Sequence, residues 1–130
     1  MQKKLIENNA ILKLTFDFSL MLMNYCELPD QSKKYIIRKQ VLRSGTSIGA
    51  SAMEAQNAES KSDFIHKIKI AAKEADETHY WLLLCEYAGH YPDCKNLFLK
   101  LEEIQKVLNK ILGTAKRKNP ISYLLSFFIF

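Results

Sequence analysis

The chain has 130 residues, of which 48% are hydrophobic and 25% charged, and it contains only four glycines and three prolines. This length indicates a single domain that can bury a core without metals or disulfides, and the composition excludes a disordered chain. The formal net charge of +5 permits contact with an anionic polymer without requiring it. Three scattered cysteines predict free thiols and a cytoplasmic location. No apolar run reaches the roughly 18–20 residues that cross a membrane, and the first residues do not resemble a signal peptide.

Apolar residues recur every three to four positions along most of the chain, which predicts amphipathic helices rather than strands. The first helix should end at Pro29, because proline cannot donate to the helical hydrogen-bond ladder. Ser60 and Asp63 resemble a capping box that opens the third helix, and a turn beginning at Gly89 closes it. The four expected helices cover residues 8–28, 31–57, 61–88 and 94–116.

Four helices with short connections favour antiparallel neighbours, so the chain is predicted to be all-α, with an up-down-up-down four-helix bundle over residues 1–118. Residues 119–130 form an apolar tail that ends in Phe-Phe-Ile-Phe. An exposed tail of this kind would promote aggregation. We therefore expect it to dock on the bundle or on a neighbouring subunit.

Small residues gather in the second expected helix around Gly45 and Gly49. Each glycine costs a helix roughly 1 kcal/mol relative to alanine, so a close helix–helix contact should compensate. A phosphate-binding loop is not favoured, because no Gly-Lys-Ser/Thr follows and a helix rather than a strand precedes the glycines. If the second and third helices form a hairpin, Arg43 comes level with Glu74 and Glu77. An arginine–carboxylate pair there would fix the register of the two helices.

No constellation of catalytic residues is present in the sequence. Asp76 and His79 have the spacing of one half of a di-iron motif, which needs a second pair and two further glutamates. Cys85, His90 and Cys94 supply three ligands, which do not close a structural zinc site. A cysteine nucleophile would need a histidine base and an orienting carboxylate, and no local pattern supplies them. We therefore expect no catalytic residue, no metal and no cofactor.

Basic residues are concentrated in two stretches that we treat as candidate nucleic-acid contacts. The candidates are Lys33, Lys34, Arg38 and Lys39 in the second helix and Lys67, Lys69 and Lys73 in the third. These side chains would either follow the phosphates of a nucleic acid or keep the helices soluble, and both interpretations remain open. Few aromatic residues neighbour these charges in the sequence, so base stacking is not expected.

Several stretches resemble the "four helix bundle protein" family, whose members are also called 23S ribosomal RNA intervening-sequence proteins. The first is Arg-Ser-Gly-Thr-Ser-Ile-Gly-Ala-Ser-Ala-Met-Glu-Ala from Arg43, and it is followed by Ser-x-x-Asp-Phe-Ile-His-Lys from Ser60. The others are Ala-Lys-Glu-Ala from Ala72 and Glu-Thr-x-Tyr-Trp-Leu from Glu77. Typical members read Ser-Ile-Gly-Ala-Asn-Ile-Ala-Glu, so this chain departs from the pattern just before Glu54. The resemblance extends to about Lys116.

The resemblance implies a small helical bundle that assembles into a ring-shaped homopentamer, without enzymatic activity or a cofactor. The family is also similar to the accessory variability determinant protein of diversity-generating retroelements, a basic pentamer that contacts nucleic acid and a reverse transcriptase. The residues to which we assign structural roles are Arg43, Gly45, Gly49, Glu54, Glu74 and Glu77.

Together, the charge and the resemblance predict a non-enzymatic oligomer that associates with nucleic acid, in particular structured RNA. Five subunits of charge +5 would carry about +25, which is a strong field for a phosphate polymer. The alternative is an oligomeric scaffold that binds another protein and whose charge is incidental. The salt dependence of RNA binding would separate these two hypotheses.

Overall fold

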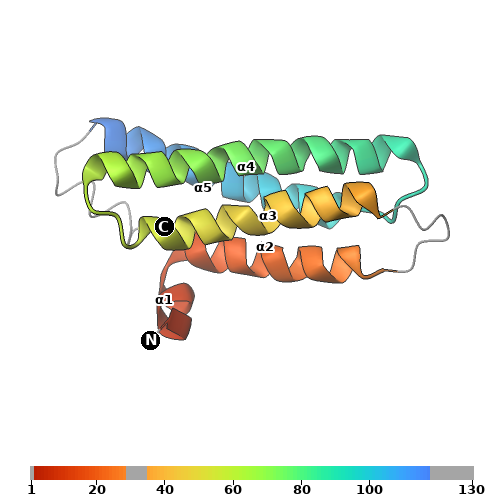
Figure 1. Ribbon diagram of the computed structural model, residues 1–130, viewed down its shortest axis with the longest axis horizontal. Helices are drawn as coiled ribbons and strands as arrows, with labels where there is room; N and C mark the ends of the chain where they lie inside the picture. Colours follow the sequence, from red (N-terminus) through yellow and green to blue (C-terminus); the bar gives the residue numbers. More distant parts are fainter. Residues whose placement is uncertain (1, 29–34, 118–130) are drawn as a thin grey trace.

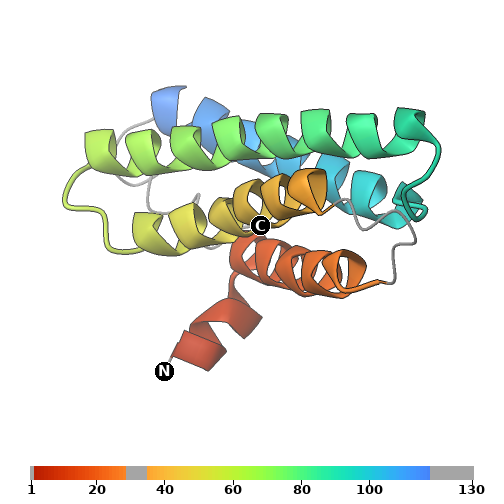
Figure 2. The same cartoon turned by 45° about the vertical axis from the view of Figure 1, so that its right-hand side comes forward.

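The computed structural model describes residues 2–28 and 35–117, which form five α-helices and no strand (Figure 1). The helices are α1 (Gln2–Asn8), α2 (Ala10–Cys26), α3 (Ile36–Ala55), α4 (Lys61–Ala88) and α5 (Lys95–Arg117). The four long helices lie side by side as an elongated bundle, in which α2 packs on α3 and α5, and α4 packs on the same two helices. The short helix α1 points away from this bundle (Figure 2). The predicted all-α class is confirmed.

The first expected helix, over residues 8–28, corresponds to α2, which is two residues shorter at each end, and the short helix α1 before it was not predicted. Asn9 separates the two helices with extended backbone angles, φ −122° and ψ 118°. Its side-chain oxygen accepts a hydrogen bond from the backbone N–H of Leu12 at 3.3 Å, which caps α2. Asparagine is among the best N-cap residues because it satisfies one of the unpaired N–H groups of the first turn.

The second long helix starts later than the sequence pattern predicts. α3 begins at Ile36, and Tyr35 before it makes no side-chain capping hydrogen bond. The expected start of this helix at residue 31 lies outside the described residues, as do Lys33, Lys34 and the apolar tail over 119–130.

The ends of α4 follow the predicted signals. Ser60 Oγ accepts a hydrogen bond from the backbone N–H of Asp63 at 3.0 Å, which confirms the cap. The carboxylate of Asp63 reaches back to the N–H of Glu59 at 3.1 Å, one residue beyond the usual partner in a capping box. Gly89 ends the helix with φ 81°, a left-handed conformation that side chains with a Cβ rarely adopt.

The core fills the space between the four long helices, and α5 contributes the most regular seam. The seam residues of α5 are Leu97, Leu101, Ile104, Leu108 and Ile111, which are all buried. Phe18 of α2, Ile48 of α3 and Phe64 of α4 meet them in the same core cluster. Burial of each such side chain contributes about 1.5–3 kcal/mol. The predicted heptad seam of the last helix is therefore confirmed.

Candidate nucleic-acid interface

The small-residue segment of α3 packs directly on α2. A Cβ atom at Gly49 would lie 3.3 Å from both Cβ and Oγ1 of Thr15, which is tighter than ordinary van der Waals contact. A Cβ atom at Gly45 would overlap the terminal methyl group of Leu22. The predicted close helix–helix contact is confirmed, and it explains why two glycines are tolerated in the middle of a helix.

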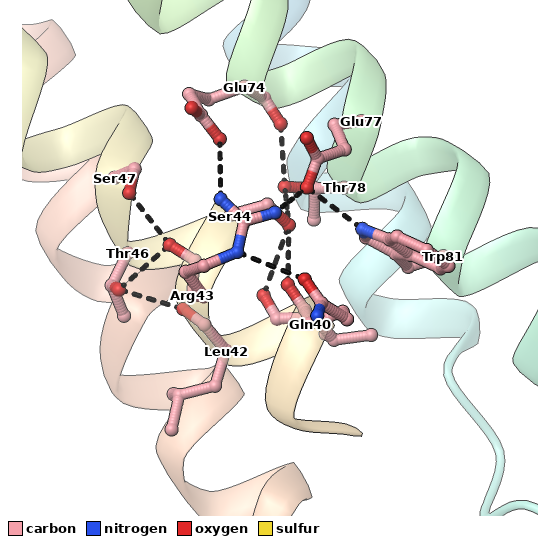
Figure 3. A network of polar contacts seen from close by, with 11 residues as sticks. Gln40, Leu42, Arg43, Ser44, Thr46, Ser47, Glu74, Glu77, Thr78 and Trp81 are labelled. Atoms are coloured by element: carbon pink, nitrogen blue, oxygen red, sulfur yellow. Dashed lines mark hydrogen bonds and ion pairs between the residues drawn. The ribbon is translucent and has the colours of Figure 1, made fainter. Parts of the chain in front are cut away.

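Arg43 joins α3 to α4 on the bundle surface (Figure 3). Its Nη2 donates a hydrogen bond to Glu77 Oε2, and its Nη1 lies 3.7 Å from Glu74 Oε2. Its Nε also donates to Gln40 Oε1 at 3.0 Å, and the indole N–H of Trp81 donates to the same oxygen of Glu77 at 2.9 Å. The predicted charge pair is confirmed. Because Arg43 is half exposed, the pair mainly fixes helix register, since such pairs add little net stability.

A buried polar contact lies below this network, and the sequence did not predict it. Thr78 Oγ1 of α4 lies 2.9 Å from Ser44 Oγ of α3, and Ser44 Oγ donates to the carbonyl of Gln40 at 2.8 Å. Thr78 Oγ1 is also 2.7 Å from the carbonyl of Glu74, so its single proton is shared between two acceptors. The contact occupies the same level of the hairpin as the Arg43 pair (Figure 3).

Arg38 is buried, with only 1% of its surface exposed, and this position differs from the solvated one expected of a phosphate contact. Its Nη1 donates to the carbonyl of Leu28 at 2.5 Å and lies 3.5 Å from that of Cys26. The guanidinium also lies 5.7 Å from the centre of the Tyr25 ring. Arg38 therefore satisfies carbonyl groups at the C-terminal end of α2, where a cation also complements the helix dipole. Within the described part of the chain, its Nε and Nη2 have no hydrogen-bond partner.

All three cysteines are free, and their surroundings make them poor nucleophiles. Burial raises the pKa of Cys26 and of Cys94 to about 11, and it also raises the pKa of Cys85. Burial likewise raises the pKa of the Tyr25 phenol, which donates to the carbonyl of Pro92 at 2.9 Å. The thiols are therefore neutral near pH 7, whereas the reactive form of cysteine is the thiolate.

The residues weighed as metal ligands have other partners. Asp76 Oδ1 accepts a hydrogen bond from Gln105 Nε2 at 3.1 Å, and the ring of His79 packs edge-on against Phe98 at 5.4 Å. Over residues 2–28 and 35–117, no three His, Cys, Asp or Glu side chains come together in a group that could hold a metal ion. No helix in the same ranges has the length and apolar character needed to cross a bilayer.

Three of the basic candidates lie on the surface with free ammonium groups. Lys39 of α3 and Lys69 and Lys73 of α4 are exposed, and none of their ammonium groups forms an ion pair or hydrogen bond with another described residue. Lys67 is partly buried and lies 3.4 Å from Glu54 Oε2, so these two residues link α4 to the end of α3. Of the basic candidates among the described residues, three therefore lie exposed on the outer sides of α3 and α4.

Large apolar side chains are also exposed in groups on α2 and α4, in addition to Ile36 of α3 and Leu99 of α5, and none of them was predicted from the sequence. Phe16, Leu20 and Met23 of α2 are each nearly half exposed at helical spacing, and we call them the α2 stripe. On α4, Tyr80 is 57% and Tyr87 is 84% exposed. The signal that could have revealed both tyrosines is that each lies two residues from a core position of α4, which places it on the opposite side of the helix.

The comparisons with known proteins decide the family. A family model described as 23S rRNA-intervening sequence protein matches residues 7–110. The chain belongs to this family. It is also similar to a solved protein of unknown function from the S23 ribosomal protein family of Bacteroides thetaiotaomicron, with 37% sequence identity and a TM-score of 0.75. That match covers 80% of this chain and 99% of the other.

No match was found among curated proteins. The range of the 23S rRNA-intervening sequence protein family includes the Arg43 network and all three exposed lysines. The resemblance inferred from the motifs is therefore confirmed at the level of the family.

Proposed function

We propose that this 23S rRNA-intervening sequence protein is an oligomer that associates with RNA through lysines on the outer sides of α3 and α4. The observation that supports the proposal is that Lys39, Lys69 and Lys73 are exposed and engage no described carboxylate. An unpaired lysine can neutralise a phosphate and release the counterions condensed on it, whereas a paired lysine must first give up its partner.

Self-association is the second part of the proposal. The α2 stripe of Phe16, Leu20 and Met23 supports it, because a row of exposed apolar side chains on an outward face commonly marks a protein contact. We expect the ring-shaped homopentamer implied by the family resemblance. Five subunits of charge +5 would carry about +25 and attract a phosphate polymer much more strongly than one subunit.

Filter binding to a structured RNA across a salt series tests the RNA association. Replacing Lys39, Lys69 and Lys73 together by glutamine should lower affinity for unrelated sequences equally and flatten the plot of log affinity against log salt. The slope should fall by about 0.7–0.9 for each lost phosphate contact. The matched control replaces Lys95 and Lys106, two exposed lysines of α5, and should leave the slope unchanged.

Sedimentation velocity at micromolar concentration tests the oligomer. The parent should sediment well above the 15.1 kDa of one chain, and Leu20→Asp in the α2 stripe should shift it toward the monomer. Leu99→Asp on α5 is the control, since Leu99 is also exposed but lies on another helix. A parent that sediments only as a monomer would remove this part of the proposal.

A protein-binding scaffold is the second candidate function. The exposed apolar side chains on both α2 and α4 favour it, because one of these faces would remain available if the other formed the oligomer. Failure of the parent protein to bind RNA at low salt would favour the scaffold.

A further inference from the structure

The outer face of α4 carries lysines and tyrosines in one line. Starting at Lys69, the exposed residues Lys73, Tyr80, Leu84 and Tyr87 follow at intervals of four, seven, four and three residues. These intervals return to the same side of an α-helix, which has 3.6 residues per turn. The core residues of α4 occupy the opposite side; they are Phe64, Ile68, Ala71, Ala75, Thr78, Leu82 and Cys85. We call the five exposed residues the α4 strip.

The carboxylates beside the middle of the α4 strip are engaged by neighbouring helices. Glu74 and Glu77 turn toward Arg43 of α3 (Figure 3). Asp76 accepts a hydrogen bond from Gln105 of α5. Arg43 therefore offsets the negative charge of Glu74 and Glu77 beside Lys73, whereas Asp76 is exposed and keeps its negative charge because its partner is a neutral amide.

The α4 strip combines the two groups that bind unpaired nucleic acid. Lysines attract phosphates, and exposed aromatic rings stack on bases, which single strands present and duplexes conceal. From Lys69 to Tyr87 the helix rises by about 27 Å, at 1.5 Å per residue, which offers room for a segment of several nucleotides. Tyr80 and Lys73 are seven residues apart in sequence but share a face. The sequence expectation that base stacking is absent therefore overlooked this arrangement.

We propose that the α4 strip binds unpaired RNA, such as a loop or a free end, with Lys69 and Lys73 on phosphates and Tyr80 and Tyr87 stacked on bases. This inference rests on the proposed RNA association and specifies the form of RNA that this surface takes. Recognition is largely independent of sequence, because every base has a flat face on which a tyrosine can stack.

The protein contains its own reporter of this surface. Trp81 is the single tryptophan of the chain, and its ring centre lies 5.6 Å from that of Tyr80. A base that stacks on Tyr80 changes the environment of this indole. Intrinsic fluorescence therefore reports on binding close to Tyr80.

The test measures binding of the full chain to three labelled probes by fluorescence anisotropy, with Trp81 fluorescence followed in parallel using unlabelled probes. The probes are an unpaired RNA of about 12 nucleotides, the same RNA as a duplex, and an abasic strand with the same number of phosphates. The parent should bind the unpaired RNA most tightly. Tyr80→Ala and Tyr87→Ala should each weaken that binding about tenfold and leave the abasic strand unaffected, whereas Tyr80→Phe should retain binding because the ring remains.

The lysines and a surface control complete the experiment. Lys69→Gln with Lys73→Gln should weaken binding to all three probes and lower the salt slope for the unpaired RNA by about 1.4, because two phosphate contacts are lost. Leu99→Ala on α5 removes a side chain that is 57% exposed, like that of Tyr80, and should leave binding to all three probes unchanged. Circular dichroism confirms that each variant remains folded.

Three results would overturn the inference. If the tyrosine variants bind unpaired RNA as the parent does, stacking on the α4 strip is rejected while RNA association itself stands. If Tyr80→Ala or Tyr87→Ala instead dissociates the oligomer in sedimentation velocity, this face is a contact between subunits. If the parent binds none of the probes at low salt, the inference and the proposed function both fail.

Discussion

Thr78 of α4 lies 2.9 Å from Ser44 of α3 through their hydroxyl oxygens, and both side chains are buried. The two residues are on the inner side of the hairpin, while Arg43 and Glu77 form an ion pair on its outer side. A shift of the hairpin by one residue would separate both pairs at once. Loss of the inner contact would destabilise the bundle more than loss of the outer ion pair, because an unpaired polar group in the core has lost its hydration without compensation.

Removal of the inner contact should destabilise the bundle. Thr78→Val keeps the side-chain shape but removes the hydroxyl, so the free energy of unfolding should fall by about 1 kcal/mol. Ser44→Ala with Thr78→Val should cost less than the sum of the two single changes, because neither partner is then left alone. Urea denaturation measures all three variants, and strictly additive losses would show that the hydroxyls do not interact.

Enlargement of Gly49 should also destabilise the bundle. Gly49→Leu would force side-chain atoms against Thr15, so we expect a loss of about 1–3 kcal/mol that exceeds the gain in helix propensity of about 1 kcal/mol. Ala50→Leu is the matched control, since Ala50 is the next residue and is exposed. Thermal melting compares the two, and a Gly49→Leu variant as stable as the parent would mean that α2 and α3 separate at low cost.

Arg38 should contribute to the stability of the fold and not to the charge of the surface. Arg38→Met retains apolar bulk but removes the donors to the carbonyls at the end of α2, so the free energy of unfolding should fall by about 1.5–3 kcal/mol. Lys39→Gln, one residue further along, should stay within about 0.5 kcal/mol of the parent because Lys39 is exposed. Equal stability of the two variants in urea would contradict the capping role of Arg38.

The buried thiols predict a loss of stability at alkaline pH. Burial raises the pKa of Cys26 and Cys94 from an ordinary value of 9.0 to about 11 in the folded chain. The folded state therefore holds these protons more tightly than the unfolded state, and the associated stability is complete below about pH 9 and lost as the pH rises through 11. The free energy of unfolding of the double variant Cys26→Ala, Cys94→Ala should fall less steeply than that of the parent between about pH 8.5 and 11. A parent and a double variant with parallel pH profiles would show that the thiols do not titrate in this way.

The parts of the structure that the sequence predicts are those encoded by local signals. Ser60 and Gly89 mark the two ends of α4 because capping and left-handed turns depend on a few neighbouring residues. The Arg43 pair follows from counting along an antiparallel hairpin. The short helix α1 was not predicted, because its seven residues are too few to establish a helical period in the sequence.

The positions of the basic residues were less predictable, because they depend on packing between distant segments. Arg38 has the same sequence neighbourhood as Lys39, yet it turns inward since the end of α2 presents carbonyl groups beside it. The common face of Lys73 and Tyr80 was not recognised because six residues separate them in the sequence. Family membership, in contrast, followed from the motifs and was confirmed.

The overlap that a Cβ atom at Gly45 would make with Leu22 has an evolutionary consequence. Leu22 is fully buried, so it cannot turn outward to make room for a larger neighbour. An alanine at position 45 therefore requires a smaller or differently branched residue at position 22. Relatives should accept changes at these two positions together, so that a covariation signal links α2 to α3 in an alignment of the family.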